Sequence, residues 1–143
     1  MTVYSHSRIS TFEQCHLKFK FQYLDEAEVE VEGTAETFLG SRVHETLEKL
    51  YKDLKFQKQN SLQELLDFYN SEWEKNWNDS ILIVREEYDK ENFRKMGEKF
   101  ITDYYNRYAP FDQAKTIGLE MRIEIKLDDK GEYVLQGFLD RLA

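Results

Sequence analysis

The segment TIGLEMRIEIKL, residues 116–127, alternates apolar and polar side chains without interruption. A period of two is that of a β-strand with one buried face. DDKG, residues 128–131, has the composition of a tight turn, and EYVLQGFLDRLA, residues 132–143, reads as a returning strand. We therefore expect a β-hairpin over 116–143, whose apolar face requires cover from other elements.

Residues 1–110 show helical periodicity instead. Helices are expected from a capping box at Ser10–Glu13 through Leu24, from 36 to 56, from a second capping box that starts at Ser61, and from 90 to 108, where Pro110 ends the last one. Their predicted buried faces are Phe12, Cys15, Phe19 and Tyr23; Leu39, Val43, Leu47, Leu50 and Leu54; Leu66, Tyr69, Trp73 and Trp77; and Phe93, Met96, Phe100, Tyr104 and Tyr108. Residues 27–32 alternate as an exposed strand or extended loop would, and 78–92 stay ambiguous.

Size and composition indicate one globular domain. The 143 residues suffice for a real core, and 15% aromatic residues argue against a disordered chain. No apolar run is long enough to span a membrane, and the first ten residues lack a signal-peptide core. A single cysteine, Cys15, excludes an internal disulfide and fits a reducing compartment, so a cytoplasmic location is expected.

The formal charge of −8 argues against non-specific coating of DNA or anionic lipid. It does not exclude a nuclease, because a metal ion held by carboxylates can attract phosphate locally. The charge is also uneven: residues 8–24 carry three basic side chains against one acid, while 25–37 carry only acids.

Three segments together resemble the RecB-type nucleases of the PD-(D/E)XK superfamily. YSHSRISTFEQCHLKFKFQYL (4–24) resembles their opening, GSRVHETLEKLY (40–51) their Gly-x-x-x-His-x-x-Leu-Glu helix, and LEMRIEIKLDDKGEYVLQGFLDRLA (119–143) their Glu-bearing strand, turn and Gly-x-(Ile/Leu)-Asp-Arg strand. Each match alone carries little information, but three in the family's order are fairly specific.

The resemblance implies an α+β or α/β fold in which an N-terminal helical region precedes the first β-hairpin of a restriction-endonuclease-like core. It implies that His44 and Asp140 are catalytic residues that bind one Mg²⁺ or Mn²⁺. The family's next strand brings a second acid and a lysine as Asp/Glu-x-Lys, and this sequence ends before it. Residues 1–143 are therefore expected to be one partial nuclease domain with an incomplete core and little activity of its own.

The chemistry is consistent with those residue types. Phosphodiester hydrolysis needs an activated water and a counter-charge, and a hard divalent cation with oxygen ligands supplies both. Ordinary alternatives exist: a histidine on a helix is more often a half-buried polar residue, and an aspartate late in a strand often starts a turn or pairs with a neighbour such as Arg141. Glu120 also matches a family position and is interpreted as structural or supporting. Lys126 and Lys130 flank the turn, away from Asp140.

Two further sets of residues have candidate roles. Some RecB-like nucleases hold a [4Fe–4S] cluster whose first cysteine lies in the N-terminal helix, where Cys15 stands. A cluster needs about four thiolates, so a buried small apolar role on the Phe12/Phe19 face is preferred for Cys15, and a cluster is not expected in this chain. Arg8 and Arg42 are candidate phosphate contacts, although exposed cations on helices are mostly solubilising.

Two functions follow as hypotheses. The first is a metal-dependent, RecB-like DNA exonuclease domain that acts in DNA repair, with DNA as its partner and a helicase subunit or domain associated. The second is a non-catalytic helical module that docks a helicase or another repair protein, in which His44 and Asp140 are merely structural.

Overall fold

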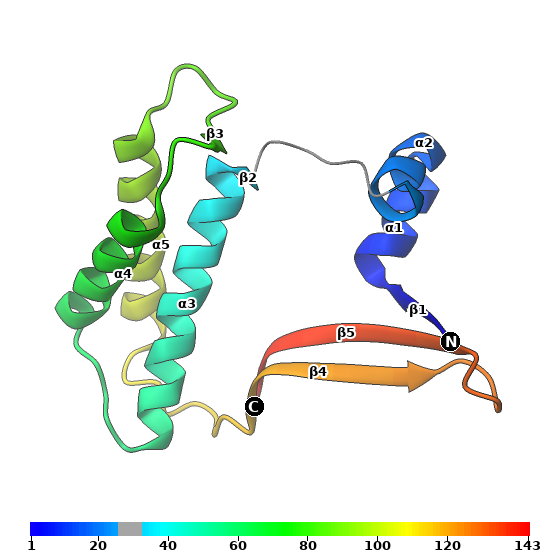
Figure 1. Ribbon diagram of the computed structural model, residues 1–143. Helices are drawn as coiled ribbons and strands as arrows, with labels where there is room; N and C mark the ends of the chain where they lie inside the picture. The colour runs from blue at the N-terminus through cyan, green and yellow to red at the C-terminus, as the bar shows by residue number, and fades with distance from the viewer. Residues whose placement is uncertain (26–32) are drawn as a thin grey trace. The chain divides into compact units, whose positions relative to one another are not determined.

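The computed structural model describes residues 1–25 and 33–143 and has a mixed α+β fold (Figure 1). It forms two compact units. The described part of the first combines 1–25 with 117–142, and that of the second is 33–116. The strand or loop predicted over 27–32 lies outside the described residues.

A three-stranded sheet organises the first unit. Its strands are β1 (Thr2–Ser5), β4 (Gly118–Lys126) and β5 (Tyr133–Leu142), in the order β1-β5-β4. β5 runs antiparallel to β4 and parallel to β1. The predicted hairpin is confirmed, and its third strand comes from the N-terminus, which no local pattern indicated.

The turn between β4 and β5 sets the register of the hairpin. The Asp128 carboxylate accepts a hydrogen bond from the backbone N–H of Tyr133 at 3.0 Å, and this bond lowers the pKa of the carboxyl. Gly131 adopts φ 68°, which glycine tolerates without the steric cost of a Cβ. The resulting pairing brings Leu119 opposite Arg141 and Met121 opposite Leu139.

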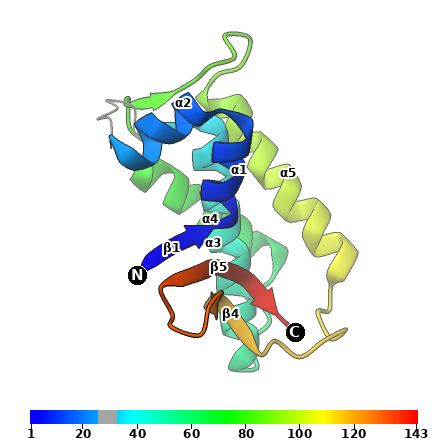
Figure 2. The same cartoon turned by 90° about the vertical axis from the view of Figure 1, so that its right-hand side faces the viewer.

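The N-terminal helical segment differs in detail from the prediction. It consists of α1 (His6–Gln14), α2 (His16–Phe19) and the π-helical turn η1 (Lys20–Leu24). The capping box at Ser10 was wrong, because the helix starts earlier, where the Ser5 side chain accepts from the Arg8 N–H. β1 leads directly into this cap (Figure 2).

Three long helices form the second unit, together with the short parallel strands β2 (Gly33–Thr34) and β3 (Ile81–Leu82). They are α3 (Ala35–Lys55), α4 (Leu62–Asn76) and α5 (Lys90–Tyr108), and each contacts the other two. The predicted capping box at Ser61 and Glu64 is confirmed, with both reciprocal bonds present. The helix predicted over 90–108 is also confirmed.

The core of this unit lies where the three helices meet, and its largest fully buried side chains are Trp73, Tyr69, Phe93, Leu50, Leu65 and Ile101. The predicted stripe of α5 was partly wrong, since Phe100 is 48% exposed while Gly97 and Ile101 are buried. On α4, Tyr69 and Trp73 are buried as predicted, and Leu65 is buried in place of Leu66. The spacing predicted the helices and part of each buried face, and it missed positions that lie next to the predicted ones.

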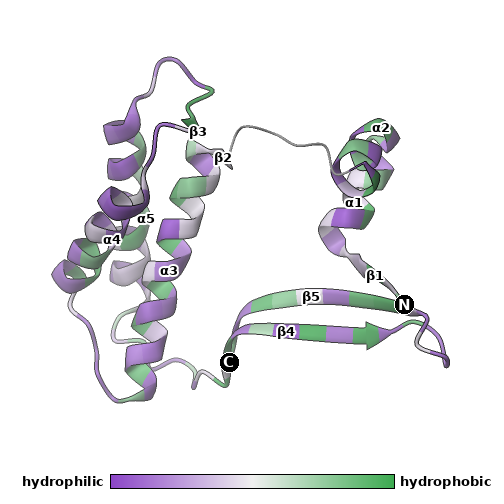
Figure 3. Ribbon diagram, viewed as in Figure 1, coloured by the Kyte–Doolittle hydropathy of each residue, from purple (hydrophilic) through white to green (hydrophobic). Residues whose placement is uncertain are grey.

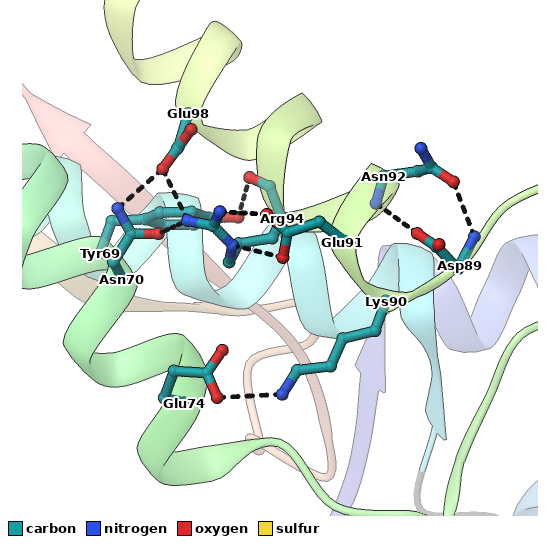
Figure 4. Close-up of polar contacts among 9 residues, drawn as sticks. All are labelled: Tyr69, Asn70, Glu74, Asp89, Lys90, Glu91, Asn92, Arg94 and Glu98. Atoms are coloured by element: carbon teal, nitrogen blue, oxygen red, sulfur yellow. Dashed lines mark hydrogen bonds and ion pairs between the residues drawn. The ribbon is translucent and has the colours of Figure 1, made fainter.

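A polar network joins α4 to α5 (Figure 4). Arg94 donates to Glu98 at 2.8 Å and also bonds Glu91 and Asn70, while Asn70 donates to Glu98 at 2.7 Å. The Tyr69 hydroxyl donates to the Arg94 carbonyl at 3.1 Å. The hydrogen bond to Glu91 raises the pKa of Arg94, so this cation stays charged and holds the two helices in register.

The hairpin keeps its two-residue alternation, visible as alternating green and purple along β4 in Figure 3. Several of its apolar side chains are exposed, among them Ile117 at 69% and Ile125 at 54%. Within the described part of the chain, none of the helices has the length and apolar character needed to cross a membrane.

Candidate metal centre

Two carboxylates meet on one face of the hairpin. The pairs on either side, Leu119 with Arg141 and Met121 with Leu139, place Glu120 of β4 directly opposite Asp140 of β5. A carboxylate oxygen of each lies within 4.8 Å of the other, and both side chains are exposed. Opposite residues of an antiparallel pair share a face, so both acids are presented to the same ligand.

The facing of these two carboxylates is unfavourable in itself, because like charges directly opposite each other destabilise a sheet. Glu120 also adopts φ 47°, in the left-handed region that non-glycine residues seldom occupy. A repulsive pair at a strained backbone position indicates a functional constraint rather than optimal strand pairing.

The neighbouring cation on this face has other partners. Arg122 forms an ion pair with Glu124 and donates to Gln136 at 3.0 Å. These bonds of Arg122 are thus made to Glu124 and Gln136, which lie opposite each other in the hairpin. The Glu120–Asp140 pair offers oxygen ligands, which is the donor type that Mg²⁺ and Mn²⁺ prefer. On this observation, the two residues fit a hard divalent cation.

His44 lies in the second unit, in the first half of α3, and is exposed. The buried residues of this helix, such as Leu39 and Leu50, occupy a different face. One turn before His44, a Cβ added to Gly40 would meet no atom within 4 Å. His44 is therefore exposed and lies outside the helical core of its own unit.

The two lysines of the hairpin lie away from the acids, as predicted. Lys126 ends β4, roughly 20 Å from Glu120 at the strand rise per residue. Lys130 belongs to the turn that follows. Neither lysine can assist a water molecule at Asp140.

The two candidate phosphate-contacting arginines have partners within the chain. Arg8 donates from Nη1 to the Val3 carbonyl at 3.0 Å. Arg42 bonds Glu45 at 2.6 Å and lies 5.0 Å from the Phe38 ring centroid, with its side chain 13% exposed. Both side chains thus help to organise their own segments.

Cys15 has a local structural role. Its Sγ accepts from the Lys18 N–H at 3.5 Å and caps α2, where α1 ends. The prediction that it is buried was wrong, because the side chain is exposed. The whole sequence has one cysteine, fewer than the four thiolates of a cluster.

Glu120, interpreted from its sequence as structural or supporting, lies opposite Asp140. The position of the turn could have predicted this pairing. If DDKG is the turn of the hairpin, the register of the two strands places Glu120 opposite Asp140. Alternation alone assigned Glu120 to a solvated face and gave no reason to link it to Asp140.

One comparison with known proteins gives a family match. A family model described as the PD-(D/E)XK nuclease superfamily matches residues 3–143. No curated protein and no solved structure matches the chain.

Proposed function

The chain belongs to the PD-(D/E)XK nuclease superfamily, and we propose that it is a metal-dependent nuclease that hydrolyses phosphodiester bonds of DNA. The observation that supports this proposal most is the Glu120–Asp140 pair, two carboxylates presented to the same side of the hairpin. Family membership supports nuclease activity, and the acidic pair supplies a reason for metal dependence.

Asp140 and Glu120 would hold Mg²⁺ or Mn²⁺ through their oxygens, and His44 would add a nitrogen ligand, which Mn²⁺ accepts readily. The bound cation would lower the pKa of a water molecule and neutralise charge on the phosphate. The carboxylates have a second role, since their negative charge keeps the phosphate group away until a cation offsets it.

The more specific assignment is to the RecB-type branch. It is supported by the helix motif that contains His44 and by the Gly-x-Leu-Asp-Arg sequence that contains Asp140. In that branch an acid and a lysine in an Asp/Glu-x-Lys strand complete the site, and residues 141–143 contain no such pair. The lysine would orient or deprotonate the attacking water, and without it residues 1–143 should show little cleavage.

A nuclease assay tests this proposal. The full product of the gene, and residues 1–143 alone if that product is longer, are incubated with end-labelled DNA and Mg²⁺ or Mn²⁺. We expect the full product to cleave, its Asp140→Asn variant to lose cleavage, and residues 1–143 without an acid-x-Lys strand to remain nearly inactive.

Two results would count against it. Undiminished cleavage by Asp140→Asn would remove the metal centre from the mechanism. A full gene product without an acid-x-Lys strand, coupled with metal-insensitive binding to a protein partner, would favour the non-catalytic module instead.

A further inference from the structure

The first unit contains a pocket away from the acidic pair. It has a volume of about 330 Å³ and is lined by Tyr4, Arg8, Ile9, Phe12 and Phe19. This volume falls in the range of small-ligand sites, about 300–1,000 Å³. Three of the five lining residues are aromatic, so the pocket suits a flat ligand.

Phe12 is an accessible aromatic wall of the pocket. It is 48% exposed, although it is a large apolar residue. Its ring stacks on His16 at 4.3 Å and meets Phe19 edge-on at 5.2 Å between centroids. These contacts hold the ring in place, so a planar group that enters the pocket would meet a pre-positioned aromatic surface.

Arg8 forms the polar side of the pocket. Its guanidinium lies 5.8 Å from the ring centroids of both Tyr4 and Phe19 and 5.5 Å from that of Tyr23. Its Nη1 donates to Val3, and its Nε is buried without a hydrogen-bond partner among the described residues. A buried donor left without a partner is costly, and Arg8 is the cationic side chain among the residues that line the pocket.

The charge around the pocket favours an anionic polymer. Residues 1–24 contain Arg8, Lys18 and Lys20 against Glu13 alone, in a protein whose formal charge is −8. Lys18 is exposed. Proteins that bind single strands combine such cations, which contact phosphates, with aromatic rings on which bases stack.

We propose that this pocket binds one unstacked nucleobase of a nucleic acid strand, stacked on Phe12, with Lys18 near the adjacent phosphates. This inference rests on the proposed function, since the strand would be the one the nuclease acts on. The pocket would hold the strand by a base rather than by its backbone alone, and would need that base to be unpaired.

Binding without metal tests the inference separately from catalysis. The probe is a fluorescein-labelled oligothymidylate of about 12 nucleotides, within the site sizes known for single-strand binders, measured by anisotropy in EDTA. We expect Phe12→Ala to weaken binding about 5- to 150-fold, the range of one lost base–aromatic stack. Phe12→Tyr should stay within about threefold of the wild type, because it keeps the ring.

Phe21→Ala is the matched control. Phe21 is 49% exposed, close to Phe12, and does not line the pocket. Its loss should leave affinity nearly unchanged. An abasic oligonucleotide of equal length should bind the wild type and Phe12→Ala equally well, and 2-aminopurine in the normal strand should be quenched by the wild type and not by Phe12→Ala.

The inference is overturned if the wild-type protein does not bind the oligothymidylate, if the abasic strand binds the wild type as tightly as the normal one, or if Phe12→Ala and Phe21→Ala weaken binding alike. Self-association that Phe12→Ala abolishes, without base-dependent binding, would assign the pocket to a protein contact and also overturn it. Base-dependent binding together with no cleavage by any longer product would refute the proposed nuclease and leave the pocket assignment standing.

Discussion

Asp140 and Glu120 show how strongly a single pair of residues depends on pairing that their local sequence does not reveal. Each alone is an ordinary exposed acid on a strand. Opposite each other, they create a repulsion that a divalent cation would turn into attraction. This reversal has a measurable effect on stability.

We predict that Glu120→Gln stabilises the metal-free protein by about 0.2–1 kcal/mol, the usual size of a cross-strand pair effect. The reason is that one of two facing negative charges is removed. Urea unfolding in EDTA measures the change. Glu124→Gln is the control, because Glu124 is paired with Arg122, and its loss should give no stabilisation.

With saturating Mn²⁺, the wild type should become more stable than Glu120→Gln. The reason is that Mn²⁺ binds preferentially to the folded state and binds the wild type more tightly. A Glu120→Gln protein that is less stable than the wild type in EDTA would show that the two carboxylates do not repel each other significantly.

Asp53 provides a pH test in the helical unit. The Lys49 side chain donates to it at 2.9 Å and Asn60 at 2.8 Å, and these bonds lower its pKa below 3.8. The folded state therefore prefers the ionised form. That stabilisation is fully present above the unfolded pKa and is lost as the pH falls through the lower folded value.

We accordingly predict that Asp53→Asn lowers the free energy of unfolding at pH 7 and that its deficit shrinks as the pH falls below about 4. Chemical denaturation across this pH range provides the measurement. A deficit that stays constant down to pH 2 would mean that Asp53 contributes through packing and neutral hydrogen bonds alone.

At the scale of elements, α5 approaches α4 and α3 closely at one point. A Cβ on Gly97 would lie 2.0 Å from the Tyr69 hydroxyl and 2.6 Å from a Leu39 methyl carbon. Tyr69 is fully buried and bonded to the Arg94 carbonyl, so it cannot easily move aside. Gly97 is thus required by packing, although glycine in a helix carries an entropic cost.

Gly97→Ala should therefore destabilise the protein by about 1–3 kcal/mol through overpacking. Gly40→Ala in α3 is a matched control, since its Cβ would meet nothing within 4 Å. It should stabilise by about 0.5–1 kcal/mol through helix propensity. Thermal unfolding of both variants distinguishes the two effects, and similar shifts in the same direction would argue against close helix contact at Gly97.

For the whole molecule, periodicity predicted what depends on neighbours in sequence. The β4–β5 hairpin and the helices α3, α4 and α5 were all found, since their patterns extend over nine or more residues. The pairing of β1 with β5 was not, because it joins segments more than 100 residues apart. The facing of Glu120 and Asp140 was not predicted either, because it depends on the register of two strands and not on the local sequence of each.

The missed positions on the helical faces had a different cause. Gly97 is buried because α5 contacts α4 and α3 closely there and not because it is apolar, and Thr46 of α3 is buried although it is polar. A count of large apolar residues therefore selected Phe100 in place of Ile101. Single-sequence patterns specify the existence of a helix better than the angle at which it packs.

The central claim, which we propose, is that Asp140, Glu120 and His44 together bind one divalent cation. Mn²⁺ titration followed by electron paramagnetic resonance tests it most directly, with pulsed spectra to detect a bound nitrogen. The account predicts one bound Mn²⁺ per chain, a nitrogen coupling that disappears in His44→Gln, and affinity at least about 100-fold lower in Asp140→Asn, since even indirect partners of a metal cost about 10- to 100-fold. Binding of Mn²⁺ by Asp140→Asn with wild-type affinity, or a spectrum without nitrogen coupling in the wild type, would contradict it.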